Sequence, residues 1–345
     1  MTAASRIIGA ILLGVLLALT GVPLGAKAAD GETLVNVKAR GVLRCGVSEN
    51  IAGFSSQDAA GRWTGIDVDF CRALAAAALG DANKAEFVPL KASARFPALQ
   101  TRRIDVLSRN TTWTLLREGA LKVQFAGVLF YDSEAFMVPD KDRQQSLASL
   151  KGATVCVQKD TSTLDHLLAY STANGLNIKP LVMDSATESG RAFFSGRCAA
   201  YTADSSYLNA LRLRAPGGAA AFSILPERIS KEPLGPVVRG GDDPWLTLVR
   251  WVLLTLIAAE EIGVTRDNLQ ARMRDPAVEQ ALVPDDVVTR AIGVEPGWTL
   301  RALQSAGNYG EMFDRNVGAH SPLRLERGIN SLWTHGGLMY APPVR

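Results

Sequence analysis

From residue 40 onwards, short apolar runs alternate with stretches in which apolar residues recur every three or four positions. Short apolar runs are typical of buried strands, and the longer periodicity is typical of helices that pack on a sheet. Their alternation predicts an α/β fold. In the first half we expect strands at 42–47, 87–90 and 104–108, and helices at 67–79 and 95–102.

The second half repeats this scheme. A basic residue, a glycine and a cysteine occur at 151, 152 and 156 with the same mutual offsets as at 40, 41 and 45. Helices are expected at 161–174 and 187–195, and strands at 178–183 and 198–202. Unrelated βαβ units can look alike by chance, so the pattern leaves open whether the two halves are truly related.

Two extended connections flank the second half. Residues 129–140 carry Pro139, and residues 229–243 are rich in proline and glycine. A chain that crosses at one connection and returns at the other forms two lobes that hinge there. We therefore expect lobe 1 at 29–133, lobe 2 at 134–233, and a return to lobe 1 with a C-terminal extension at 234–345. That last part is expected to contain helices at about 245–261 and 265–274.

Residues 1–28 have the features of a secretory signal peptide. Arg6 precedes an apolar run at 7–19, and the small residues that end the segment favour cleavage after Ala28. An uncleaved membrane anchor is the alternative, since residues 7–26 are uncharged and long enough to span a bilayer. Export predicts a soluble protein in an oxidising compartment, which in a Gram-negative bacterium is the periplasm.

Four cysteines therefore favour disulfide bonds: Cys45, Cys71, Cys156 and Cys198. Four cysteines allow three pairings. Because two lie in each half, we favour Cys45–Cys71 and Cys156–Cys198, with buried unpaired thiols as the alternative. The sequence contains no Cys-x-x-Cys, which disfavours a redox enzyme.

The composition excludes several classes of function. The 345 residues are 47% hydrophobic and 21% charged, with a formal net charge of +3. This balance disfavours an acidic disordered chain and a polybasic nucleic-acid-binding protein. His166, His320 and His335 lie far apart without a metal-ligand spacing, so we expect no metal site. The local motifs of serine hydrolases, P-loop proteins and zinc proteases are also absent from the sequence.

The sequence Gly-Ile-Asp-Val-Asp-Phe at 65–70 resembles the signature of extracellular solute-binding proteins for polar amino acids. Four further stretches sharpen this likeness to the general L-amino-acid-binding subgroup: 104–113, 231–236, 307–318 and 333–345. The resemblance covers essentially the whole chain after the signal segment. It implies a type II periplasmic binding protein fold, in which two Rossmann-like lobes are joined by a two-strand hinge.

The resemblance also implies a function. A member of this family captures free L-amino acids, here with broad specificity, by closing its two lobes around them. It then delivers them to the permease of an inner-membrane ABC transporter. The family implies a monomer with no cofactor, no nucleic-acid partner and no enzymatic activity.

A free amino acid presents a carboxylate and an ammonium, and burying both requires a partner for each. Arg117 follows the predicted strand at 104–108, at the sheet edge where α/β proteins bind ligands. The resemblance assigns to Arg117 the ligand carboxylate, with hydrogen bonds added by Asn110 and Thr112. It assigns to Asp204, after a strand of the second half, the ligand ammonium. The alternative for Asp204 is a helix N-cap.

Thr161 and Ser162 open a predicted helix, whose N-terminal amides favour an anion. The resemblance assigns them to closure on the carboxylate, and the alternative for Thr161 is a simple N-cap. The family usually has glycine where this chain has Asp160. An aspartate can adopt the left-handed conformation that this glycine would have, but its charge would be unfavourable beside a carboxylate.

The pocket for the ligand side chain is less clearly marked. Phe54 is expected to form an apolar wall. Receptors for basic amino acids often carry an aromatic residue where this chain has Ile51, which disfavours strict specificity for cationic side chains. Arg95 matches a pocket position in smaller relatives, where it would favour acidic or amide side chains or only shape the cleft.

Two other classes of protein remain as alternatives. Periplasmic cyclohexadienyl dehydratases resemble this fold and need a general acid or base, for which Glu49 and Lys159 are the candidates by position. Arg117 and Asp204 fit an amino-acid ligand better than such a reaction. A sensor that presents itself to a signalling partner is the third reading, and transport is preferred over it.

Overall fold

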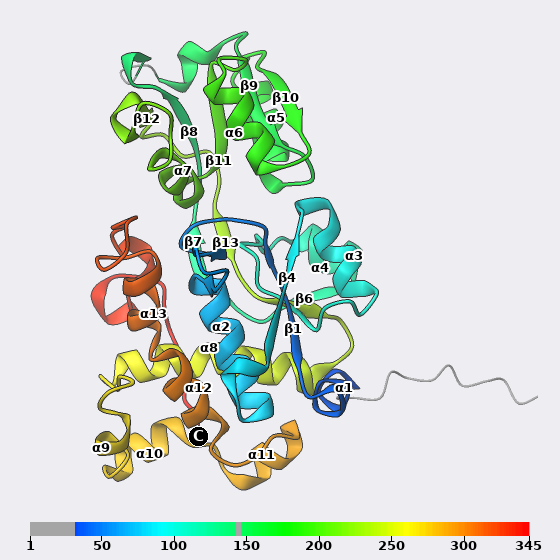
Figure 1. The fold of residues 1–345 in the computed structure, drawn as a ribbon, viewed down its shortest axis with the longest axis vertical. Coiled ribbons are helices and arrows are strands. Elements are labelled where there is room, and N and C mark those ends of the chain that lie inside the picture. Colours follow the sequence, from blue (N-terminus) through cyan, green and yellow to red (C-terminus); the bar gives the residue numbers. More distant parts are fainter. Residues whose placement is uncertain (1–31, 143–145, 345) are drawn as a thin grey trace, which may run out of the picture.

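Two five-stranded sheets, one in each lobe, form the framework of the chain in this computed structural model, which describes residues 32–142 and 146–344 (Figure 1). In lobe 1 the strand order is β4-β1-β5-β14-β6. β1, β4 and β5 are parallel, and β14 runs antiparallel to both of its neighbours. The strands are β1 (Leu43–Ser48), β4 (Ala85–Leu90), β5 (Val106–Leu107), β6 (Val123–Phe125) and β14 (Val237–Arg239).

Lobe 2 has the same strand arrangement, in the order β10-β9-β11-β8-β12. In both sheets the first βαβ strand lies between the second and the third, and the fourth position is taken by an antiparallel strand that arrives from the other lobe. The repeat that the sequence suggested is thus a repeat of topology. The strands are β8 (Glu134–Pro139), β9 (Thr154–Gln158), β10 (Lys179–Met183), β11 (Ala200–Asp204) and β12 (Phe222–Ile224).

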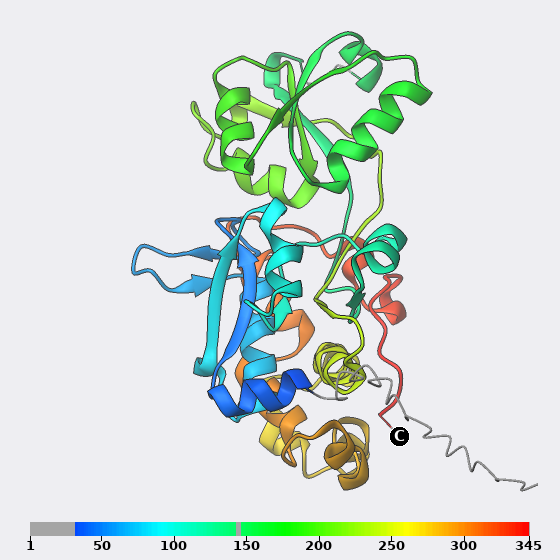
Figure 2. The same cartoon turned by 90° about the vertical axis from the view of Figure 1, so that its right-hand side faces the viewer.

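The two lobes are joined by a short antiparallel pair, β7 (Phe130–Asp132) and β13 (Glu232–Leu234). β7 continues into β8 of lobe 2, and β13 continues into β14 of lobe 1. Figures 1 and 2 both show these crossing segments side by side between the lobes. A hinge of two strands lets the lobes turn relative to each other without breaking either sheet. A separate hairpin consists of β2 (Ser56–Gln57) and β3 (Trp63–Thr64).

Helices cover both faces of each sheet, and alternation along the strands decides which side chains face which helices. In β8, Phe136 and Val138 pack with the helix α5, whereas Ala135 and Met137 pack with α6 and α7. The helices of the two βαβ arrays are α1 (Glu32–Arg40), α2 (Ile66–Leu79), α3 (Arg95–Gln100), α4 (Leu115–Leu121), α5 (Ser162–Ala173), α6 (Ala186–Phe194) and α7 (Ser205–Arg212).

The sequence of helix α2 explains both its close packing and the point where it ends. Its alanine-rich sequence is buried on nearly every face, because small side chains allow α12 (Trp298–Ala306) and the sheet to approach closely. The helix ends at Gly80, which adopts a left-handed conformation with φ of 77° and donates its N–H to the Ala76 carbonyl. Glycine reaches this conformation without a Cβ penalty.

The C-terminal part packs on lobe 1 and contains more helix than expected. Helix α8 was predicted, but the helix expected at 265–274 is only the four residues of α9. Two of the four later helices begin at a side-chain cap, Asp275 for α10 and Asn308 for α13, and all four are too short for periodicity to reveal. The helices are α8 (Asp243–Glu261), α9 (Leu269–Arg272), α10 (Pro276–Leu282), α11 (Asp286–Ile292), α12 (Trp298–Ala306) and α13 (Tyr309–Asn316).

Both predicted disulfide bonds are confirmed. Cys45 of β1 is bonded to Cys71 of α2, and Cys156 of β9 is bonded to Cys198 just before β11. Each bond therefore lies within one lobe and leaves the hinge free. The predicted signal segment lies outside the described residues. Within the described part of the chain, no helix has the length and apolarity needed to cross a bilayer.

Replacing Cys156 and Cys198 together by alanine is expected to lower the free energy of unfolding by about 3–4 kcal/mol, because the bond closes a loop of 42 residues in the unfolded chain. Urea unfolding of the oxidised protein and the double variant measures this difference. The Cys45–Cys71 pair, with a separation of 26, serves as the comparison and should give a slightly smaller loss. Equal stability of variant and parent would show that the bond contributes nothing.

Candidate functional site

A cavity of about 50 Å³ lies between the lobes, at the carboxyl ends of β5 and β11 and the N-terminus of α5. Parallel sheets bind ligands at this edge. Seven of the eight residues predicted to contact a ligand line this one cavity, three from lobe 2 and four from lobe 1: Thr161, Ser162, Asp204, Arg95, Asn110, Thr112 and Arg117.

Phe54 is the exception, and its expected place as a pocket wall is corrected. Its side chain is 1% exposed and lies in the core of lobe 1, edge-on to Phe130 at 5.2 Å between ring centroids. Ile51 lines the cavity instead. A tight turn, in which the Phe54 N–H donates to the Ile51 carbonyl at 3.1 Å, sends the two side chains in different directions.

Arg117 is fixed in the cavity wall by the loop that precedes it. Thr114 caps α4 by accepting the Arg117 backbone N–H at 3.2 Å, and the Arg117 guanidinium donates to the Thr112 carbonyl at 2.5 Å. The guanidinium also lies 5.6 Å from the ring of Phe96. Burial lowers the pKa of Arg117. A guanidinium has five N–H donors in a planar fork, so more remain than the carbonyl of Thr112 uses.

Two more arginines face the same cavity. Arg95 is 3% exposed and donates to the Asp160 carbonyl of lobe 2 at 3.1 Å, while its Nε has no partner in the described part of the chain. Arg109, which the sequence analysis did not identify, donates to the Leu90 carbonyl at 2.9 Å. Burial, then the charges of Arg117 and Arg109, lowers the pKa of Arg95, and burial lowers that of Arg109 to about 10. The three guanidinium groups repel one another, and an anion in the cavity would offset that repulsion.

Asp204 presents the opposite charge from lobe 2. It stands at the N-cap position of α7, but its side chain makes no capping hydrogen bond, and its carboxylate instead accepts from Asn110 Nδ2 of lobe 1 at 3.2 Å. Burial, followed by the charges of Asp132 and Glu232, raises the pKa of Asp204 well above its ordinary value. Among the described residues, no basic nitrogen lies within 4.0 Å of this carboxylate. A cation there would offset the cost of its burial.

Asn110 is held in an uncommon backbone conformation, with φ of 31°. Its N–H donates to Asp67 Oδ2 at 3.2 Å, and the other oxygen of Asp67 accepts from the Ser108 hydroxyl at 2.7 Å. Burial raises the pKa of Asp67 to about 6. Asp67 therefore positions the loop that carries the site. It lies inside the 65–70 signature, which was the only sequence signal for this role.

On the lobe 2 side, Thr161 caps α5 by accepting the Leu164 N–H at 3.4 Å, as the alternative interpretation of this residue predicted. Thr161 also lines the cavity, so it has both positions at once. Asp160 adopts the left-handed conformation expected of it, with φ of 60°. The Ser162 hydroxyl lies 3.0 Å from the Thr112 hydroxyl of lobe 1. Both hydroxyls donate to Glu232 Oε2, at 3.1 and 2.5 Å.

Glu232 belongs to a hinge cluster that the sequence analysis missed, consisting of Glu134, His166 and Glu232. His166 Nδ1 lies 2.9 Å from Glu232 Oε1 and 3.5 Å from Glu134 Oε2. Both carboxylates are at most 1% exposed. Hydrogen bonds to Glu134 and Glu232 raise the pKa of His166 to about 10, whereas burial raises that of Glu134 to about 7.

The ligand atoms of the hinge cluster lie within 4.8 Å of one another, so these three side chains could hold a metal ion. A protonated imidazole satisfies the same geometry without one, because it places a positive charge between two buried carboxylates. No sequence spacing joins residues 134, 166 and 232, so only the fold reveals the cluster.

Comparisons with known proteins identify the family of this chain. A model of the bacterial extracellular solute-binding proteins, family 3, matches residues 43–268. The general L-amino acid-binding periplasmic protein AapJ of Rhizobium johnstonii is 44% identical over 99% of this chain and 98% of its own length. The glutamate/glutamine/aspartate/asparagine-binding protein BztA of Rhodobacter capsulatus is 44% identical over 93% of this chain and 96% of its own.

Among solved structures, an ABC transporter periplasmic binding protein from Brucella ovis with glutathione bound is similar throughout. It covers 92% of this chain and 100% of its own, with a TM-score of 0.87 and 43% sequence identity. The two-lobed α/β fold expected from the sequence is thereby confirmed. The chain belongs to family 3 of the bacterial extracellular solute-binding proteins.

Proposed function

We propose that this chain binds free L-amino acids between its lobes and delivers them to the permease of an ABC transporter. The observation that carries the proposal is the placement of Arg117 and Asp204, from opposite lobes, on one cavity. Arg117 offers a planar fork for the ligand carboxylate. Asp204 lies among acidic groups, which makes a ligand ammonium its natural partner.

The two lobes make different contacts with such a ligand. Arg117, Asn110 and Thr112 belong to lobe 1, so an amino acid docks there first through its carboxylate. Closure about β7 and β13 then brings Asp204, Thr161 and Ser162 to the same molecule. The ligand stabilises the closed form because only that form makes both sets of contacts. The closed protein, acting as a periplasmic monomer, is the form that the permease recognises.

A binding role is favoured over the dehydratase alternative. Glu49 and Lys159, the nominated acid and base, are not among the residues that line the cavity. The relatives described above are named as binding proteins. We therefore assign no catalytic residue, cofactor or nucleotide site to this chain.

Thermal unfolding of the exported protein with each of the twenty L-amino acids, glutathione and prephenate tests this function. A ligand at a hundredfold excess over its Kd adds about 2.7 kcal/mol to the free energy of unfolding, so binding raises the melting temperature. Stabilisation by many amino acids supports a broad receptor. Turnover of prephenate without stabilisation by any amino acid would replace the proposal by an enzyme.

Arg95 is proposed to select ligands with a second carboxylate, because three arginines exceed what one carboxylate requires. In Arg95→Gln, the affinity for L-glutamate relative to L-glutamine is expected to fall by about tenfold or more, since a hydrogen bond to a charged group contributes about 1.5–3 kcal/mol. Calorimetric titration with both amino acids measures the ratio. An unchanged ratio would leave Arg95 only a role in shaping the cleft.

A further inference from the structure

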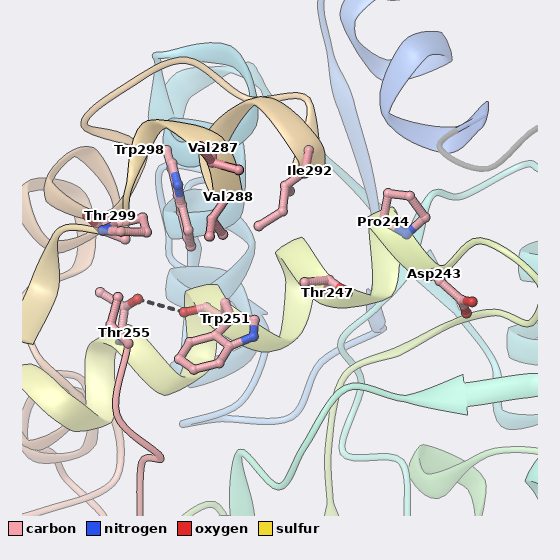
Figure 3. A pocket seen from close by; sticks show the side chains of 13 residues that line it. Asp243, Pro244, Thr247, Trp251, Thr255, Val287, Val288, Ile292, Trp298 and Thr299 are labelled. Atoms are coloured by element: carbon pink, nitrogen blue, oxygen red, sulfur yellow. Dashed lines mark hydrogen bonds between the residues drawn. The ribbon is translucent and has the colours of Figure 1, made fainter.

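The polar groups of the cleft differ from those of a larger cavity, of about 610 Å³, on lobe 1 between α8, α11 and α12. The walls of the larger cavity are mostly apolar, and the Thr255 hydroxyl there donates to the Trp251 carbonyl of its own helix at 2.7 Å (Figure 3). Several hydroxyls of the cleft instead donate to carboxylates of the hinge cluster. The direction of these hydrogens decides which end of a ligand the hydroxyls can hold.

Glu232 of the hinge strand β13 receives the hydrogens of two hydroxyls that meet between the lobes. The Thr112 hydroxyl of lobe 1 donates to Glu232 Oε2 at 2.5 Å, and the Ser162 hydroxyl of lobe 2 donates to the same oxygen at 3.1 Å. These hydroxyls lie 3.0 Å apart, and both residues line the cleft. A hydroxyl has one hydrogen to donate and two lone pairs to offer. Thr112 and Ser162 therefore have lone pairs, rather than hydrogens, left for a ligand.

The other oxygen of Glu232 also faces donors. The Ser230 hydroxyl donates to Glu232 Oε1 at 2.6 Å, and His166 Nδ1 lies 2.9 Å from it. Glu232 is only 1% exposed, so these neighbours take the place of water around its carboxylate. Hydrogen bonds to a charged acceptor are stronger than those between neutral groups. The hydrogens of Thr112 and Ser162 are therefore already used before a ligand enters.

Two further acceptors belong to residues that line the cleft. Asn110 Nδ2 donates to the Asp204 carboxylate at 3.2 Å, and Asn110 Oδ1 is buried with no partner within the part of the chain that the structure describes. The reverse orientation of this amide would place its oxygen against a carboxylate. The Thr161 hydroxyl donates to the Gln158 carbonyl at 2.7 Å, so its hydrogen is used as well. These acceptors suit an ammonium, whereas the arginines of the cleft have only donors and suit a carboxylate.

We propose that Glu232 is a positioning residue that makes Thr112 and Ser162 acceptors for the ammonium of a bound amino acid. This role rests on the proposed function, because it requires an amino acid in the cleft. The ammonium then donates to the two hydroxyl oxygens and to the Asp204 carboxylate, while the guanidinium groups hold the ligand carboxylate. Thr112 and Ser162 thus hold the opposite end of the ligand from the one that the resemblance implies. Because they come from opposite lobes, this set of acceptors is complete only in the closed form.

Glu232→Gln tests this role through the sign of its effect. His166 and Ser230 are donors that keep the amide oxygen of the glutamine on their side, so its NH₂ group turns toward Thr112 and Ser162. Both hydroxyls then accept from the amide and direct their hydrogens against an ammonium. Affinity for whichever of the twenty L-amino acids binds the parent most tightly should fall by about tenfold or more in titration calorimetry. Stronger binding would mean that the hydroxyls donate to the ligand carboxylate, and either stronger or unchanged binding overturns the proposal.

The Thr112→Val background separates this role from a merely structural one. Valine has the shape of threonine but no hydroxyl to reorient, so the loss caused by Glu232→Gln should be smaller there by about threefold or more. Equal losses in both backgrounds overturn the proposal, because Glu232 would then act on the hinge as a whole.

Ser230→Ala is the matched control. Ser230 donates to the other oxygen of Glu232 and does not line the cleft, so this variant should bind within about threefold of the parent. A loss as large as that of Glu232→Gln would also overturn the proposal, since any missing partner of Glu232 would then weaken binding. If none of the twenty amino acids binds the parent, the proposed function itself fails and this role fails with it.

Discussion

Replacing Arg117 by alanine is expected to weaken the binding of every L-amino acid by between about a hundredfold and a few thousandfold. Removing one partner of a buried, hydrogen-bonded charge pair costs about 3–5 kcal/mol, because the remaining charge stays buried without compensation. In the proposed complex, the remaining charge is the ligand carboxylate. Titration calorimetry with the amino acid that binds the parent most tightly measures the loss.

The matched control is Arg250→Ala. Arg250 also donates to a backbone carbonyl, that of Ala126 at 3.2 Å, but it lies on α8 away from the cavity. This variant should change stability more than affinity. Arg117→Lys should give an intermediate loss, since lysine retains the charge without the planar fork. If Arg117→Ala bound amino acids as the parent does, the carboxylate would have to be held by Arg95 or Arg109.

Asp204→Asn tests the other end of the ligand. The amide has the shape of the carboxylate but no charge, so it no longer attracts an ammonium. Burial raises the pKa of Asp204 above its ordinary value, and a bound ammonium would lower it again, so at a pH where the free carboxyl is partly protonated the parent should release protons on binding. Calorimetry in buffers of different ionisation enthalpy detects these protons, and the variant should not release them.

Much of this site was accessible from the sequence because its residues follow predictable strands. Arg117 follows β5 and Asp204 ends β11, so each lies at the carboxyl edge of the sheet in its own lobe, and these two edges face the same cavity. The cysteine pairs were also predictable, because each pair falls inside one half of a repeated pattern.

The residues that the sequence misplaced or did not reveal share one property: their positions depend on tertiary packing. The direction of Phe54 depends on one tight turn, which periodicity does not describe. The hinge cluster joins residues that are distant in sequence, and its burial exists only once β7 and β13 have paired. Arg109 lies two residues beyond a strand only two residues long, and nothing in the sequence separates it from a solvent-exposed arginine.

His166→Gln is expected to lower the free energy of unfolding by about 2–3 kcal/mol near pH 7. Removing the cation from a buried pair costs about 3–5 kcal/mol, and the partial exposure of His166 reduces that cost. The variant leaves Glu134 and Glu232 facing each other without a positive charge. Glutamine retains a hydrogen-bond donor, so the loss reports the charge rather than the packing. Urea unfolding measures it, with the exposed His320→Gln as the control.

The pH dependence separates a charge from a merely structural role. Because the folded-state pKa of His166 is raised to about 10 from 6.5, its stabilisation is complete below pH 6.5 and is lost as the pH rises toward 10. The raised pKa of Glu134, about 7, has the same sign, so its burial also removes stability as the pH rises. Because His166 lowers the pKa of Glu134, this loss should occur at a higher pH in the variant than in the parent. The difference between parent and His166→Gln should therefore shrink between pH 7 and 10. A difference that stays constant over this range would mean that His166 stabilises the hinge through packing alone.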